Sequence, residues 1–160
     1  MRNVNGQEEK VDLDTLKKWM SHAGQDFEED ADGFLHAVRG NLETSVACPD
    51  EADLVVCFAP LLELSGLDEA HRAEVLSQAL ALNGVGSLPP GCALSYDEAA
   101  DAVYLLWQQD PDELDDARFG NALDDFGTAA GQVQGYLRGL AAADGGARND
   151  ARAAENFIKV

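Results

Sequence analysis

The chain has 160 residues, which is enough for one domain with its own core. Thirty Asp and Glu against eleven Lys and Arg give a formal net charge of −19 at pH 7, so few cations are available to neutralise nucleic-acid phosphates or anionic lipids. We therefore expect no nucleic-acid or membrane partner, and a neutral or basic protein segment is the natural complement. Hydrophobic residues make up 46% of the sequence, too many for a disordered acidic chain.

The cysteines and the longest apolar stretches indicate the cellular compartment of the protein. Cys48, Cys57 and Cys92 are odd in number, far apart and without a CxxC pair, and no basic, apolar signal segment precedes them. No apolar stretch approaches the roughly 20 residues needed to span a bilayer. We expect a protein of a reducing cytoplasm that is not embedded in a membrane.

The first predicted element is a short amphipathic helix. Leu13, Leu16, Trp19 and Met20 follow helical spacing, and Asp12 is a plausible N-cap. Residues 1–10 are polar without apolar periodicity, and residues 142–160 are mostly Ala, Gly and charged residues. We therefore predict a domain over residues 12–141, with a flexible N-terminus at 1–11 and a flexible tail at 142–160.

Three strands are expected after an acidic loop. The loop covers residues 27–33, and short strands follow at residues 34–38 and 42–47. Residues 54–59 are apolar on both faces and rich in β-branched side chains, which is typical of a central strand.

The second half of the chain predicts a helix, a hairpin and a longer helix. An apolar stripe indicates a helix over residues 68–83, and alternating residues indicate a hairpin of 92–96 with 103–108. A last helix is expected to begin near Asp110, with an i, i+4, i+7 apolar repeat to Leu140. The order α-β-β-β-α-β-β-α predicts an α+β fold, a twisted and mainly antiparallel sheet with helices packed on it.

The sequence carries no recognisable catalytic or metal-binding motif. His22, His36 and His71 lie in different predicted elements, without HExxH, HxH or a cysteine partner at zinc spacing. No GxSxG motif, phosphate loop or calcium-binding loop is present. We expect no enzyme activity, no metal and no cofactor.

Several large apolar residues lie in short elements, where they serve either the core or a binding surface. Residues of the types favoured in protein-binding sites are Trp19, Met20, Phe34, Leu35 and Trp107. If the first helix lies beside an edge strand, the two would form a groove for an extended peptide. Burial in the core is the alternative for each residue.

Three segments together resemble the Tir chaperone family, the class I chaperones of type III secretion. They are the leucine-rich helix from Arg72 to Asn83 and Gly84, the segment Gly91–Asp97, and the segment Ala102–Trp107. In that family a similar helix ends in Asn, a glycine-containing link follows, and a hairpin leads to a long C-terminal helix. The resemblance covers roughly Leu13 to Leu140.

The resemblance implies an ATP-independent, cytoplasmic homodimer that keeps the N-terminal region of a secreted effector extended and soluble, with the secretion ATPase as a further partner. It places effector binding on five residues: Leu16, Trp19, Met20, Phe34 and Leu35. It places the dimer interface on the middle helix and the following strand: Leu76, Leu80, Leu82, Val85, Leu88, Leu94 and Tyr96. A regulatory adaptor that binds a secretion gatekeeper or a transcription factor is the alternative, and an enzyme of unrecognised type is a third possibility.

Overall fold

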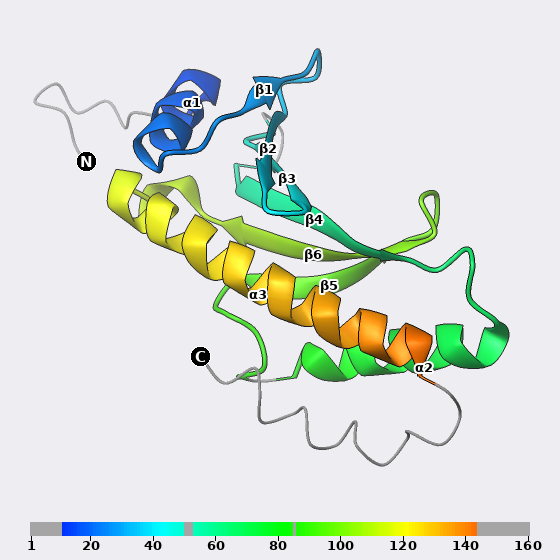
Figure 1. The fold of residues 1–160 in the computed structure, drawn as a ribbon. Coiled ribbons are helices and arrows are strands. Elements are labelled where there is room, and N and C mark those ends of the chain that lie inside the picture. Colours follow the sequence, from blue (N-terminus) through cyan, green and yellow to red (C-terminus); the bar gives the residue numbers. More distant parts are fainter. Residues whose placement is uncertain (1–10, 50–52, 85, 144–160) are drawn as a thin grey trace, which may run out of the picture.

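The structure, a computed structural model, describes residues 11–49, 53–84 and 86–143. Its elements follow the predicted α+β order and surround one six-stranded antiparallel sheet with strand order β1-β2-β3-β4-β6-β5 (Figure 1). They are α1 (Leu13–His22), β1 (Glu28–Glu29), β2 (Leu35–Arg39), β3 (Leu42–Ala47), β4 (Val55–Glu63), α2 (Glu69–Leu82), β5 (Cys92–Asp97), β6 (Ala102–Gln109), a 3-10 turn (Pro111–Glu113) and α3 (Asp116–Ala142).

Aspartates fix the start of each α-helix. Asp12, Asp68 and Asp115 are the N-caps of α1, α2 and α3, and each side chain accepts a hydrogen bond from the backbone N–H three residues later. These bonds satisfy amide groups that have no partner within the helix, and the carboxylates favour the positive end of the helix dipole. Part of the acidic composition therefore serves to start the helices.

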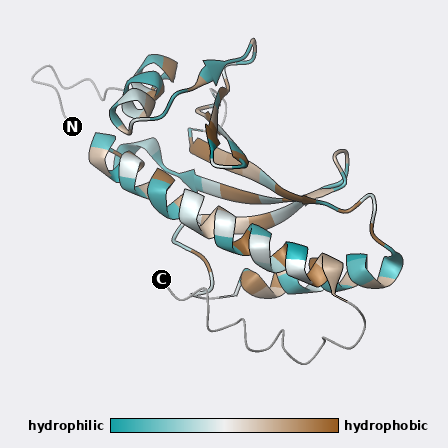
Figure 2. Cartoon of the chain, in the orientation of Figure 1, coloured by the Kyte–Doolittle hydropathy of each residue, from teal (hydrophilic) through white to brown (hydrophobic). Residues whose placement is uncertain are grey.

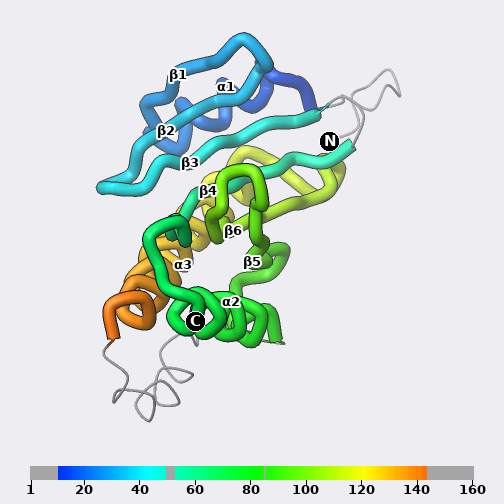
Figure 3. The backbone as a smooth tube through the Cα atoms, turned by 90° about the vertical axis from the view of Figure 1, so that its right-hand side faces the viewer, coloured from blue at the N-terminus to red at the C-terminus, as the bar shows by residue number. Residues whose placement is uncertain are grey.

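The long helix α3 runs along the sheet, with α1 beside its first turns and α2 beside its last turns (Figure 1). The rings of Trp19 and Phe119, which join α1 to α3, have centroids 5.4 Å apart. At the other end, Tyr136 on α3 donates a hydrogen bond of 3.0 Å to the Gln78 side chain on α2. The strands twist strongly from β2 to β5 (Figure 3).

The core lies between the helices and one face of the sheet. Leu16, Leu105 and Phe119 are fully buried there, and hydrophobic residues are prominent along β4 (Figure 2). A bulge in β4 near Pro60 takes the strand out of regular register with β6. The buried Gln134 side chain donates a 3.1 Å hydrogen bond to the carbonyl of Leu61, so the irregular strand keeps its buried polar group satisfied.

Three predicted boundaries differ from the structure. Glu28 and Glu29, predicted as loop, form the edge strand β1, and Lys17 on α1 pairs with Glu29. Strand β4 continues past residue 59 to Glu63, because the bulge accommodates Pro60 within a central strand. The last α-helix begins at Asp116, because residues 111–113 form a separate 3-10 turn.

The ends of the predicted domain lie close to the ends of the described region. Val11 is buried in the core and α3 continues to Ala142. Residues 1–10 and 144–160 lie outside the described residues, so the flexible ends stay predictions.

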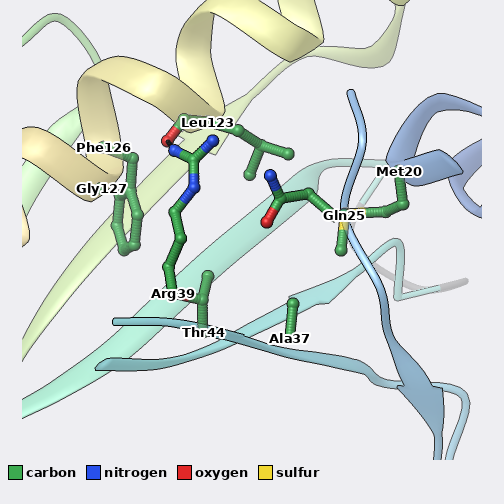
Figure 4. Close-up of a pocket in the computed structure, with 8 residues that line it drawn as sticks. All are labelled: Met20, Gln25, Ala37, Arg39, Thr44, Leu123, Phe126 and Gly127. Atoms are coloured by element: carbon green, nitrogen blue, oxygen red, sulfur yellow. Dashed lines mark hydrogen bonds between the residues drawn. The ribbon is translucent and has the colours of Figure 1, made fainter. Parts of the chain in front are cut away.

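Arg39 joins the β2–β3 hairpin to α3. Its guanidinium donates to the carbonyl of Leu123 at 3.3 Å (Figure 4). It also donates to the Asp124 carboxylate at 2.5 Å. The pocket beside it, bordered by Met20 and Phe126, has a volume of only about 20 Å³. That is room for about one water molecule, so the contact between the β2–β3 hairpin and α3 is a packing contact and not a ligand site.

Candidate protein-binding surface

The face of the sheet that points away from the helices is rich in apolar and aromatic side chains. Alternation along β4 puts Cys57 and Ala59 in the core and Val56 and Phe58 on the opposite face. The register carries this face across the neighbouring strands, since Phe58 lies opposite Leu106 on β6. We call it the open sheet face and define it by seven residues: Phe34, His36, Val38, Val56, Phe58, Tyr104 and Leu106. The described helices pack on the other face (Figure 1).

Three aromatic rings form a row across the open sheet face. Phe34 meets Phe58 edge-on, with ring centroids 5.8 Å apart, and Phe58 lies 6.3 Å from Tyr104. All three side chains are half-buried, and Val38 at the end of β2 is 71% exposed. Such pairs hold each ring in place, so the row presents a preformed apolar surface from β4, β6 and the residue before β2.

One end of this row is polar and acidic. The His36 ring stacks beside Phe34, with Nδ1 2.9 Å from Ser45 Oγ and Nε2 2.8 Å from Asp30 Oδ2. The hydrogen bond from His36, together with the backbone N–H of Phe34, lowers the pKa of Asp30. Glu43 lies at the same end, 4.0 Å from the His36 ring. A partner segment with apolar side chains and a basic residue would complement this arrangement.

The residues expected to bind an effector fall on two sides of the sheet. Phe34 belongs to the open sheet face, whereas Leu16, Trp19, Met20 and Leu35 are buried between α1, α3 and the sheet, with at most 8% of each residue exposed. Helical spacing correctly indicates that α1 has an apolar stripe, but the stripe packs on α3 in the described chain. Direct contact of these four residues with an effector stays a prediction.

Sequence reasoning missed Phe58 and Tyr104 as residues of a binding surface. The signal was present, because residues 54–59 are apolar on both faces. That pattern is typical of a strand buried on both sides, but it also fits a strand whose second face is available to a partner.

The residues expected at a dimer interface are spread along α2 and β5. Leu80 is 73% exposed and Tyr96 is 41% exposed, whereas Leu82 and Leu94 are buried within the chain. Leu76 and Leu88 are half-buried, and Val85 lies outside the described residues. Leu80 and Tyr96 are therefore the most accessible members of the predicted set.

Tyr96 is held by an ionic network between α2 and the β5–β6 hairpin. Arg72 contacts both Asp101 carboxylate oxygens, at 2.6 and 2.9 Å, and donates to the Tyr96 hydroxyl at 2.7 Å. The same hydroxyl donates to Asp101 at 2.8 Å. The hydrogen bond from Arg72 lowers the pKa of Asp101, and the hydrogen bond to Asp101 raises the pKa of Tyr96. The network fixes an exposed aromatic ring beside α2.

The described residues offer little to metal or nucleophilic chemistry. Among residues 11–49, 53–84 and 86–143, no group of three or more His, Cys, Asp or Glu side chains is placed to hold a metal ion. Burial raises the pKa of the Cys57 thiol well above its usual range, which keeps it protonated and unreactive. Within the same part of the chain, no helix is long and apolar enough to cross a membrane.

Comparison with solved structures shows a shared fold at low sequence identity. The ExsC–ExsE complex aligns with a TM-score of 0.58 and 15% identity, over 82% of this chain and 95% of that chain. The Yersinia pestis type III secretion chaperone SycH, in complex with a stable fragment of YscM2, gives 0.54 and 16%, over 76% and 98%. The ExoT–SpcS complex from Pseudomonas aeruginosa gives 0.55 and 18%, over 75% and 94%.

Comparison with family models assigns the sequence, while a comparison with curated proteins finds no match. The model of the Tir chaperone protein (CesT) family matches residues 15–134, a range from the first turn of α1 to the second half of α3 that includes all six strands. The resemblance found in the sequence is thereby confirmed: this chain belongs to the Tir chaperone protein (CesT) family.

Proposed function

We propose that the protein is an ATP-independent chaperone of type III secretion, which binds the N-terminal region of a secreted effector in the bacterial cytoplasm and keeps it extended and soluble. The observation that carries the proposal is the open sheet face, where a row of aromatic rings from β4, β6 and Phe34, just before β2, has no described element packed on it. The free energy of the system falls when a partner covers apolar surface of this kind.

The charge distribution supports a polypeptide client over other ligands. The net charge of −19 keeps a chaperone–client complex soluble and repels other acidic surfaces. Asp30 and Glu43 add carboxylates at the end of the aromatic row. The client segment is therefore expected to carry apolar residues together with Lys or Arg.

A homodimer is part of the proposal. Leu80 and Tyr96 provide exposed apolar surface on α2 and β5, on the helix side of the sheet and away from the open sheet face. Two protomers joined there would offer two client surfaces to one wrapped chain, which increases its avidity. Delivery of the client to the secretion ATPase would follow as a further interaction of the complex.

The test is a pull-down of the tagged protein from its native cytoplasm, with light scattering on the eluate and mass spectrometry of the polypeptides that accompany it. We expect a dimer carrying a protein that is secreted. A copurifying gatekeeper or transcription factor would instead favour the regulatory adaptor. A monomer without a polypeptide partner would contradict both.

Two matched substitutions test which face binds the client. Tyr104→Thr and Tyr96→Thr exchange the same residue types on adjacent strands, but Tyr104 lies on the open sheet face and Tyr96 on the helix side. We expect Tyr104→Thr to reduce the recovered client while the dimer remains, and Tyr96→Thr to act on the dimer. Client recovery that is unchanged by Tyr104→Thr would reject the open sheet face as the binding site.

A further inference from the structure

A second surface feature lies on the helix side of the sheet, where the link before β5 meets the first turns of α3. It is an open pocket of about 490 Å³, within the range of known ligand pockets. Its apolar walls come from the link, from β5 and β6, from the end of the 3-10 turn and from α3: Pro89, Pro90, Cys92, Trp107, Leu114 and Ala122. The open sheet face contributes none of its residues.

The wall formed by the link is held in place by Gly91. This residue has φ +80°, and a Cβ on it would lie 2.9 Å from the Gln108 carbonyl and 3.0 Å from the Trp107 indole nitrogen. Only glycine allows the backbone to cross the indole this closely. Since Gln108 N–H also donates to the Gly91 carbonyl at 3.2 Å, the pocket is preformed.

The floor of the pocket is apolar and uncharged. Trp107 is 4% exposed and pairs with Cys92 across the two strands. Burial, together with the nearby Asp125 carboxylate, raises the pKa of the Cys92 thiol to about 11. The thiol is therefore protonated at neutral pH and acts as an apolar wall, not as a nucleophile.

The rim carries negative charge that its one cation does not cancel. Glu113 and Asp125 both border the pocket. Arg118 borders it too, but its guanidinium donates to the Glu113 carbonyl at 2.9 Å and lies 3.7 Å from the Asp115 carboxylate. An apolar floor beneath an acidic rim suits a ligand that combines an apolar group with a positive charge.

We propose that this pocket binds a short polypeptide segment of a partner protein, with an aliphatic side chain over Trp107 and a neighbouring Lys or Arg at Asp125 and Glu113. A second copy of the chain is assigned to a different surface, because the proposed dimer uses Leu80 and Tyr96, and neither residue lines this pocket. The inference deepens the proposed function. It rests on that function in one respect only, which is the identification of the partner as the client. Peptide binding to the purified protein tests the pocket separately.

The two tryptophans give a direct readout, because the full chain contains only Trp19 and Trp107. Each indole N–H gives one peak in a nitrogen–proton correlation spectrum, and Trp19→Phe assigns them. Trp107 lies in the pocket, whereas Trp19 packs on Phe119 between α1 and α3. A ligand in the pocket should shift the Trp107 peak and leave the Trp19 peak in place.

The probe is the blocked peptide acetyl-Gly-Lys-Leu-Lys-Gly-amide. We expect it to shift the Trp107 peak with a Kd of about 1 mM or tighter. The peptides with Glu in place of Lys, or with Ser in place of Leu, should bind at least about threefold more weakly. The first lacks the positive charge that the acidic rim attracts, and the second lacks the aliphatic side chain that packs on Trp107. Equal shifts with all three peptides, or no shift with any of them, would overturn the proposal.

Variants of the full chain test the two parts of the pocket. Asp125→Asn should weaken the Lys-containing peptide about threefold, and Ala122→Met should block binding by filling the pocket. Glu98→Gln removes one charge from the distant β5–β6 turn and should have no effect; an equal loss from Glu98→Gln would show attraction by overall charge alone and reject the site.

Spectra recorded without added peptide test two other possible occupants of the pocket. A Trp107 peak that moves on dilution of the protein would assign the pocket to a second copy. A Trp107 peak that moves when the chain is ended at Ala143 would assign it to residues 144–160. Either result would overturn the proposal, whatever the outcome of the native pull-down.

Discussion

The side chain of Asn83 pairs with both backbone polar groups of Leu94. Its Nδ2 donates to the Leu94 carbonyl at 3.0 Å, and its Oδ1 accepts from the Leu94 N–H at 2.7 Å. Leu94 lies in β5, the last strand of the sheet, so the C-cap of α2 occupies the middle of an edge that would otherwise be open to another strand. Association of two chains at this edge must therefore use side chains and not a continuous sheet.

Removing this pairing should destabilise the protein. Asn83→Ala leaves the N–H and C=O of Leu94 without their partner, and we expect a loss of about 1–3 kcal/mol in the free energy of unfolding. Asn83→Asp keeps the acceptor and loses the donor, so at neutral pH its loss should be smaller. Urea unfolding followed by circular dichroism measures both; a wild-type midpoint for Asn83→Ala would contradict the structural role of the pair.

Gly127 on α3 should respond to alanine differently from Gly131 on the same helix. Gly131 is exposed with no atom within 4 Å of an added Cβ, so Gly131→Ala should stabilise the protein by about 1 kcal/mol through helix propensity. An added Cβ at Gly127 would lie 3.0 Å from Arg39 Nη1, so Gly127→Ala should stabilise the protein less than Gly131→Ala does.

The difference between these variants depends on Arg39 and can be tested in its absence. In an Arg39→Ala background no guanidinium crosses α3, so the two glycine substitutions should stabilise the protein equally. Thermal unfolding of the four combinations gives the comparison. A difference that persists in the Arg39→Ala background would show that the close approach of Arg39 is not its cause.

The fold was more predictable from the sequence than the binding surface was. Apolar periodicity gave the helices and most strands correctly, because a residue's position in a helix or strand decides which side it buries. It does not say what covers that side. The stripe containing Trp19 was expected to receive a partner and packs on Phe119, whereas Phe58, expected in a central strand, lies on the open sheet face. The pairing of Glu28 and Glu29 with β2 depends on tertiary contacts such as that of Glu29 with Lys17.

The contribution of Asp101 to stability should depend on pH. Arg72 holds the pKa of the folded Asp101 below its ordinary value of 3.8, so this contribution is present above about pH 4 and is lost as the pH falls through the lowered value. Asp101→Asn should lower the thermal midpoint at pH 7, and the difference from wild type should shrink toward about pH 2. Asn tolerates the backbone φ of 48° found at this position, so the substitution adds little strain.

Glu98→Gln is the matched control, since it removes one negative charge from the same β5–β6 turn without breaking a contact with Arg72. A pH-independent difference for Asp101→Asn, or one equal to that of Glu98→Gln, would contradict the ionic network as its source.

The last prediction separates the proposed dimer interface from the core of the protomer. Leu80 is 73% exposed whereas Leu82, two residues later on α2, is 8% exposed. Leu80→Glu should therefore leave each protomer folded but convert the proposed dimer to monomers, because it places a charge on apolar surface that a partner would cover. Leu82→Glu should unfold the chain, and Ala117→Glu, on the exposed side of α3, should change neither property. Light scattering and circular dichroism on the three variants give mass and fold together. A Leu80→Glu protein that remains dimeric would place the interface elsewhere, and one that unfolds would show that Leu80 supports the protomer itself.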